Sequence, residues 1–296
     1  MSLAAIFDVA APAKLNLFLH VTGRRADGYH LLQSLFVLID WCDTLHFERR
    51  SDGALARHDL GPALPADDLC LRAARLLQHE SGTALGADIS IDKQVPWGAG
   101  MGGGSSDAAS TLLALNRLWG LNWPRVRLLA LGLQLGADVP FFVNGRNAIA
   151  EGIGELLTPV PVPAQWLGVV KPAASIETRA IFASPLLVRS TAPAILESFA
   201  ASAAARADQA VIEPGFGRND LQAAAESECA EVAAAARALY RQFGNSRMTG
   251  SGSAVFARAG TGPAPSAAMP APLVPGWVGR MCRSLPEHPL VGWAAD

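Results

Sequence analysis

Lysine is scarce in this chain of 296 residues: 24 residues are lysine or arginine, and only Lys14, Lys93 and Lys171 are lysines. The four cysteines lie far apart and form no Cys-x-x-Cys pair, which argues against a zinc site and against a disulfide framework. Acidic residues number 26 and the formal net charge is −2, so the basic excess that nucleic-acid binding requires is missing. We therefore predict no nucleic-acid partner, although a few local groups can still hold a small anion.

Long apolar runs are missing as well. No stretch approaches the roughly 18 apolar residues that span a bilayer, and residues 1–10 have no basic segment before their apolar part. We expect a cytoplasmic protein without a membrane partner. Half of the residues are nevertheless hydrophobic, which excludes a disordered chain.

The length predicts two domains, because one hydrophobic core rarely grows this large. Predicted strands and helices follow one another without strict alternation, which favours the α+β class. The segment 158–163 (TPVPVP) is stiff and extended and predicts the junction. We therefore expect domains at residues 1–157 and 158–296.

The first predicted strand covers residues 13–21, where apolar and polar side chains alternate. Lys14 and Asn16 then share one face of the strand, about 7 Å apart. Residues 34–49 predict a further pair of strands, and residues 139–143 (VPFFV) predict a short one.

Helices are predicted at three further places. Asp67 and Asp68 indicate the start of a helix that runs to about Glu80. A second helix is expected between a cap at Asn122 and Gly136. The alanine-rich stretch 194–211 also favours a helix.

A glycine-serine loop opens directly into a strong helix within residues 96–109 (PWGAGMGGGSSDAA). We expect Ser105 or Ser106 as the N-cap, with Asp107 in the first turn. The unpaired amides at such a helix start bind phosphate, and glycine lets the phosphate approach the backbone. The alternative is an ordinary flexible loop with a serine cap.

Other glycine-rich phosphate motifs fit less well. Gly98, Gly100 and Gly103 match the dinucleotide fingerprint, but that motif needs an acidic residue about 20 positions later. Between Asp107 and Asp138 the sequence has neither Asp nor Glu. The GxxxxGK[ST] motif and the protein-kinase signatures are also absent from the sequence.

Five blocks in order carry a family resemblance: PAKLNLFL at 12–19, GRRADGYH at 23–30, the loop at 96–109, LGADVP at 135–140 and TGSGS at 249–253. The chain resembles the GHMP family of small-molecule kinases. The first two blocks point to those members that act on a cytidine-diphosphate methylerythritol. The resemblance spans about residues 11–258 and is weak at 185–215 and in the last 40 residues.

The resemblance implies a two-domain fold, with an N-terminal domain like ribosomal protein S5 domain 2 and a ferredoxin-like C-terminal domain. It also implies transfer of the γ-phosphoryl group of ATP to the substrate's 2-hydroxyl, in the non-mevalonate route to isoprenoid precursors. Asp138 would be the general base for a hydroxyl that is a poor nucleophile at neutral pH. Lys14 would keep that carboxylate ionised and stabilise developing charge, and Asn16 would orient the alcohol.

ATP would lie along the glycine loop, with Mg²⁺ bridging its phosphates. The implied ATP-binding residues are Pro96, Trp97, Gly98, Ala99, Gly100, Met101, Gly102, Gly103, Gly104, Ser105 and Ser106. Ser106 could also meet the metal ion directly. Asp107 could reach the ion through water or could simply be a charge at the helix start. Trp97 and Met101 depart from the smaller or branched side chains common in the family.

The substrate would be recognised through its cytosine. The resemblance places Tyr29 on one face of the base, Phe182 on the other and His30 at its hydrogen-bonding edge. The further implied substrate contacts are Thr178, Gly250 and Ser251. The TGSGS turn would close over the phosphates.

The sequence leaves two alternatives open. Another GHMP kinase, acting on homoserine, mevalonate or a sugar, would keep the glycine loop but should lack the Tyr29-His30 pair. A non-catalytic nucleotide-binding relative would be suspected if Asp138 or Lys14 were missing, and both are present. We expect a monomer or a weak homodimer.

Overall fold

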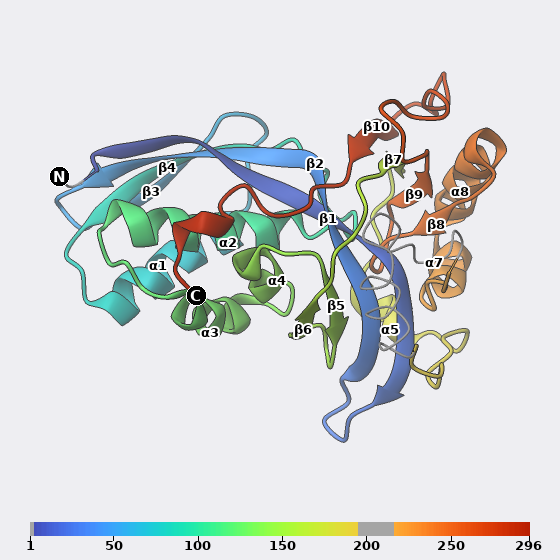
Figure 1. Cartoon of the computed structure of the whole chain (residues 1–296), viewed down its shortest axis with the longest axis horizontal. Coiled ribbons are helices and arrows are strands. Elements are labelled where there is room, and N and C mark those ends of the chain that lie inside the picture. Colours follow the sequence, from blue (N-terminus) through green and yellow to red (C-terminus); the bar gives the residue numbers. More distant parts are fainter. Residues whose placement is uncertain (1–2, 195–215) are drawn as a thin grey trace.

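The chain folds into two sheets, each covered by helices, in a computed structural model that describes residues 3–194 and 216–296 (Figure 1). The first sheet holds β1 (Ala5–Arg24), β2 (His30–Arg50), β3 (Leu55–Asp59), β4 (Gly86–Asp92), β5 (Ala148–Glu151) and β6 (Leu156–Pro159). Its order is β3-β4-β2-β5-β6, with β1 paired to β2, and only β3 and β4 are parallel.

The second sheet has the order β10-β7-β9-β8 and is antiparallel throughout. It holds β7 (Trp166–Lys171), β8 (Arg247–Met248), β9 (Val255–Arg258) and β10 (Val278–Arg283). The β1–β2 ribbon bends past this sheet, so that the two halves of the molecule meet along β1 (Figure 1). A buried cluster that includes Leu15, Leu17, Val169 and Phe256 fills that junction.

Helices pack on both sheets. They are α1 (Leu69–Ser81), α2 (Gly103–Leu118), α3 (Arg125–Leu135), α4 (Val139–Asn144), α5 (Thr178–Ala183), α7 (Gln222–Glu228), α8 (Ala230–Phe243) and the short 3-10 helix η1 (Val291–Trp293). The first four form one core with the first sheet, and α7 and α8 form another with the second sheet. In the described part of the chain, no helix is long and apolar enough to traverse a bilayer.

Several local predictions are confirmed. Asp68 caps α1 by accepting from the amide of Leu71 (3.0 Å), and Gly82 ends the helix in the left-handed conformation. Residues 13–21 lie within β1, and Gly136 ends α3. The alanine-rich stretch 194–211 lies outside the described residues except for residue 194.

Two strand predictions are wrong. Residues 34–49 belong to the single strand β2, whose beginning pairs with β5 and whose end pairs with β4. The VPFFV segment is part of helix α4, and its five side chains are all buried. An entirely apolar segment shows neither the helical nor the strand periodicity of polar and apolar residues. Pro140 fits the first helical turn, because a backbone N–H at that position would have no partner within the helix.

Two predicted helix starts are also wrong. Gly102, with φ of 70°, precedes the first residue of α2, so both serines lie inside the helix and Asp107 lies in its second turn. Helix α3 begins after Pro124 rather than at Asn122, which has φ of 50°. Neither helix start has a side-chain cap: the N-cap of α2 is the left-handed Gly102, and that of α3 is the extended Pro124.

The last residues return to the first sheet. Ser284 bridges to Ile39, and Leu290 and Ala294 join the core beneath α2 and α3. The guanidinium of Arg125 donates to the carbonyl oxygens of Val143 (2.7 Å) and Ala294 (2.8 Å). The domain boundary at residue 157 stays a prediction. Residues 284–296, which were assigned to the second domain, pack on the first.

Candidate active site

Lys14 joins three parts of the predicted site. Its Nζ donates to Asn16 Oδ1 (2.6 Å) on the same strand and lies 3.4 Å from Asp138 Oδ2, just before α4. Its backbone N–H donates to the carbonyl oxygen of Met101 (2.9 Å) in the glycine loop. The Lys14 side chain is buried over the ring of Phe36, whereas Asp138 is partly open to solvent. A substrate group can therefore reach the carboxylate but not the lysine stem.

Asn16 is held by two residues that the sequence analysis did not select. Asn16 Nδ2 donates to Ser34 Oγ (2.8 Å), and the backbone N–H of Asn16 donates to Thr249 Oγ1 (2.8 Å). The Thr249 hydroxyl in turn donates to Asn16 Oδ1 (3.3 Å). These contacts fix which end of the Asn16 amide faces Lys14. Thr249 begins the TGSGS block, whereas no motif marks Ser34.

The glycine loop is covered by the TGSGS turn from the second half of the chain. The amide of Ser253 donates to the carbonyl oxygen of Gly98 (3.3 Å), and that of Ala254 donates to Ala99 (3.1 Å). Thr178 and Ser251 are also brought together, because their hydroxyls lie 2.8 Å apart.

A cavity of about 410 Å³ opens beside the loop. All residues from 96 to 105 line it, whereas Ser106 does not. Trp97 is exposed at this cavity, but the Met101 side chain is buried in the core between the two sheets. Met101 therefore serves the site through its backbone. The opposite wall, which the sequence analysis did not find, comes from residues 64–72 and includes Leu64, Pro65 and Asp68.

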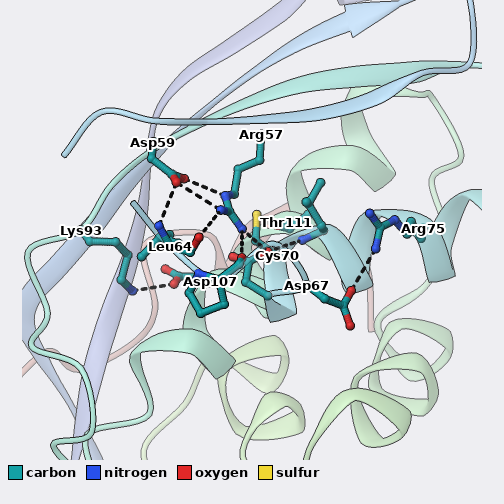
Figure 2. Close-up of polar contacts among 12 residues, drawn as sticks. Arg57, Asp59, Leu64, Asp67, Cys70, Arg75, Lys93, Asp107 and Thr111 are labelled. Atoms are coloured by element: carbon teal, nitrogen blue, oxygen red, sulfur yellow. Dashed lines mark hydrogen bonds and ion pairs between the residues drawn. The ribbon is translucent and has the colours of Figure 1, made fainter. Parts of the chain in front are cut away.

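Lys93 lines the cavity and lies between two buried carboxylates. Its Nζ donates to Asp107 Oδ2 (2.6 Å), as Figure 2 shows, and to Asp43 Oδ2. Asp43 Oδ1 also accepts from the amides of Gln94 and Val95. Burial acts to lower the pKa of Lys93, but the negative charges of Asp107 and Asp43 outweigh it and raise the pKa above its ordinary value. Only the scarcity of lysine drew attention to this residue in the sequence.

Two buried oxygens near the start of α2 have no protein partner among the described residues: Ser106 Oγ and Asp107 Oδ1. Burial is the largest influence on Asp107 and raises the pKa of its carboxyl. The described residues contain no group of three His, Cys, Asp or Glu side chains placed to hold a metal. A hydroxyl and one carboxylate oxygen still suit Mg²⁺, which takes few protein ligands when phosphates supply the others.

The predicted base-binding residues lie at the start of β2 and in α5. The rings of His30 and Phe182 stack with centroids 4.9 Å apart, and Tyr29, the residue before His30, is 60% exposed. Arg189 Nε donates to His30 Nε2 (3.3 Å). Burial, followed by the positive charges of Arg189 and Arg24, lowers the pKa of His30. His30 therefore presents a neutral ring whose Nε2 is already occupied.

Comparisons with known proteins agree on one family. Residues 68–146 match the GHMP kinases N terminal domain, and residues 196–268 match the GHMP kinases C terminal domain. The chain is 67% identical to a 4-diphosphocytidyl-2-C-methyl-D-erythritol kinase of Methylibium petroleiphilum, over 99% of this chain and all of that protein. It is 56% identical to the kinase of the same name from Variovorax paradoxus, over 98% and 99% of the two chains.

Solved structures support the same fold. A crystal structure of 4-(cytidine 5'-diphospho)-2C-methyl-D-erythritol kinase has a TM-score of 0.73 and 32% identity, covering 93% of this chain and 98% of that one. Homoserine kinase from Cytophaga hutchinsonii has a TM-score of 0.68 at 14% identity, covering 97% and 96%. At that identity the second likeness concerns the fold alone.

Proposed function

Because the chain belongs to the 4-diphosphocytidyl-2-C-methyl-D-erythritol kinases of the GHMP family, we propose that it phosphorylates the 2-hydroxyl of that cytidyl compound. The chain is a phosphotransferase, and ATP is its co-substrate. We further propose that it serves isoprenoid precursor synthesis as a cytoplasmic monomer or weak homodimer, without nucleic-acid or membrane partners.

The contact that carries this proposal is the one between Lys14 and Asp138. It puts a partly exposed carboxylate beside a buried ammonium whose own backbone is bonded to the glycine loop. The acceptor alcohol and the phosphates of ATP can thus meet at one point. Phosphoryl transfer depends mainly on such positioning and on neutralising charge.

In the proposed step, the 2-hydroxyl oxygen forms a bond to the γ-phosphorus while the bond from that phosphorus to the bridging β-γ oxygen breaks. Asp138 accepts the hydroxyl proton, and ADP leaves with the bridging oxygen. Lys14 stabilises the charge that builds up beside it. Asn16, fixed by Ser34 and Thr249, holds Lys14 in place and orients the alcohol.

Residues 96–106 would hold ATP, with free backbone amides of the glycine loop directed at the phosphates. Ser106 would hold Mg²⁺, with Asp107 beside it, because both carry a buried oxygen without a protein partner in the described chain. Bound there, the ion would neutralise the phosphate oxygens.

Tyr29, His30 and Phe182 would bind the cytosine. The stack of His30 on Phe182 brings these two rings together between the start of β2 and α5, and the exposed ring of Tyr29, next to His30 in the chain, is open to stacking on a base. Thr178, Gly250 and Ser251 would contact the substrate nearer the phosphates, where the two hydroxyls already meet.

A coupled assay of ADP release tests the function. Wild type with Mg-ATP should turn over the cytidyl methylerythritol and leave homoserine, mevalonate and galactose unchanged. Phe182→Ala should raise KM for the cytidyl compound about tenfold while KM for ATP stays the same, because base stacking contributes about 1–3 kcal/mol. Turnover of one of the other alcohols alone would overturn the assignment of the acceptor.

A further inference from the structure

The wall of the cavity that faces the glycine loop combines an irregular connection with the start of a helix. It is built by Leu64 and Pro65, in the connection between β3 and α1, and by Asp68 and Leu69 at the start of that helix. A nucleotide whose phosphates lie on the loop has the rest of this cavity for its ribose and base. The position of this wall therefore decides how well a base fits.

One buried side chain behind the wall holds it in place. Arg57 of β3 has a side chain that is only 7% exposed, and it does not line the cavity. It lies at the centre of the contacts drawn in Figure 2, which also shows the contact between Lys93 and Asp107. Arg57 is thus placed to act on the wall without touching what the cavity holds.

The Arg57 guanidinium makes four hydrogen bonds and a further ion pair. Nε donates to Asp59 Oδ1 (2.7 Å) and Nη2 to Asp59 Oδ2 (3.1 Å), which makes a bidentate pair. Three further contacts reach the wall. Nη2 donates to the carbonyl oxygen of Leu64 (3.2 Å), and Nη1 donates to that of Pro65 (2.9 Å). Nη1 also forms an ion pair with Asp68 Oδ1 (2.9 Å). Asp59 Oδ2 also accepts from the amide of Leu64 (2.9 Å).

These contacts tie three elements to one rigid group. They join the end of β3, the connection after it, and the first turn of α1, since Asp68 is the cap of that helix. A guanidinium presents its five donors in a fixed plane, whereas a lysine ammonium offers three donors on a flexible stem. No other side-chain type can make the same set of bonds.

We propose that Arg57 is a positioning residue that fixes the Leu64–Leu69 wall of the cavity and thereby sets the enzyme's affinity and base selectivity for its nucleotide. The inference rests on the proposed function only in taking the cavity as the ATP site. It does not depend on which alcohol is phosphorylated.

The same region provides a matched control. Arg75 of α1 pairs with Asp67 (2.9 Å) in the same connection, but both side chains are largely exposed and the arginine makes no bond to the wall carbonyls. Such surface pairs contribute little to stability. Arg75→Lys should therefore leave nucleotide binding as it is in wild type.

The experiment compares wild type with Arg57→Lys, Asp59→Asn and Arg75→Lys. Calorimetric titration with Mg-ATP, without an acceptor, gives Kd, and steady-state assays give kcat/KM for ATP and for GTP. Arg57→Lys should weaken ATP binding about tenfold and reduce the preference for ATP over GTP, while KM for the cytidyl compound is unchanged. Asp59→Asn should also weaken ATP binding and reduce the preference for ATP over GTP, but by a smaller factor.

A folded Arg57→Lys with wild-type Kd and wild-type base preference would overturn the proposal. An equal rise in KM for ATP and in KM for the cytidyl compound would also overturn it. If Arg57→Lys does not fold, Asp59→Asn decides by the same two measurements. If wild type binds Mg-ATP but does not phosphorylate the cytidyl compound, only the assignment of the acceptor is overturned. A wild type that does not bind Mg-ATP would overturn the role of the cavity and of Arg57 with it.

Discussion

Gly100 and Gly250 pack backbone against backbone. A Cβ added to Gly250 would lie 2.6 Å from the carbonyl oxygen of Gly100, and one added to Gly100 would lie 2.5 Å from that of Thr249. Both glycines have positive φ, 71° and 54°. The glycine loop and the TGSGS turn, which are 150 residues apart (250 − 100), therefore meet without room for a side chain.

Gly100→Ala and Gly250→Ala should each lower kcat/KM for ATP at least about tenfold, because the loop must move and its backbone is strained. Assays at varied ATP concentration measure the effect. Gly292→Ala is the control, because its added Cβ meets nothing within 4 Å. Wild-type kinetics in both of the first two variants would contradict the close approach.

Asp138→Asn should lower kcat by about 10²–10⁴, because the amide cannot take the hydroxyl proton. Lys14→Met should lower kcat as well, and the double variant should lose less than the product of the two effects, because the residues act as a unit. Single-turnover assays measure the chemical step. Asp8→Asn, at a side chain that is 89% exposed, should behave like wild type. Unchanged turnover in Asp138→Asn would exclude a general base at this position.

Lys93→Met should lower the free energy of unfolding by about 3–5 kcal/mol, because it leaves Asp43 and Asp107 buried without their cation. Adding Asp107→Asn should restore part of that loss, since one of the two carboxylates is then neutral. Urea unfolding of the single and double variants measures both changes. A double variant less stable than Lys93→Met would contradict the electrostatic explanation.

Binding of the cytidyl substrate should depend on pH through His30. Burial and Arg189 hold the pKa of His30 below its ordinary value of 6.5, so the ring stays neutral as the pH falls through 6.5. Arg189→Met removes a positive charge and should raise this pKa, so that KM for the substrate begins to rise at a higher pH than in wild type. Arg189→Lys keeps the charge and should stay closer to wild type. Identical pH profiles in all three proteins would exclude this coupling.

Stability should fall in acid through His288. Burial, and then the charge of Arg125, lower the pKa of His288 to about 3. Between pH 6.5 and 3 the unfolded chain therefore binds a proton that the folded chain does not, and the free energy of unfolding drops by about 1.4 kcal/mol per pH unit. His288→Asn should have a smaller slope between pH 6 and 4 in urea titrations. His79→Asn, at an exposed histidine, should keep the wild-type slope.

Sequence reasoning succeeded where the structure depends on near neighbours. Alternation along residues 13–21 put Lys14 and Asn16 on one strand face, and their side chains are bonded in the structure. Asp68 and Gly82 marked the ends of α1 because capping involves only a few adjacent residues. The glycine loop, the family and its kinase activity followed from motifs that are continuous in the chain.

The sequence failed where local patterns allow two outcomes. VPFFV is apolar throughout, so only its packing between α2, α3 and the sheet decides that it is helical. Helix α2 starts after Gly102 and α3 starts after Pro124, and neither start is marked by a capping side chain, which was the signal that the prediction used.

The sequence by itself therefore determined the reaction class and the fold family, and it supplied the residues that we propose for the chemistry. Only the tertiary structure decided what supports them: Arg57 behind the cavity wall, Lys93 between Asp43 and Asp107, and Thr249 on Asn16. Such contacts join residues as many as 233 positions apart. Their geometry follows from how whole sheets and helices pack, so a pattern of neighbouring residues does not contain it.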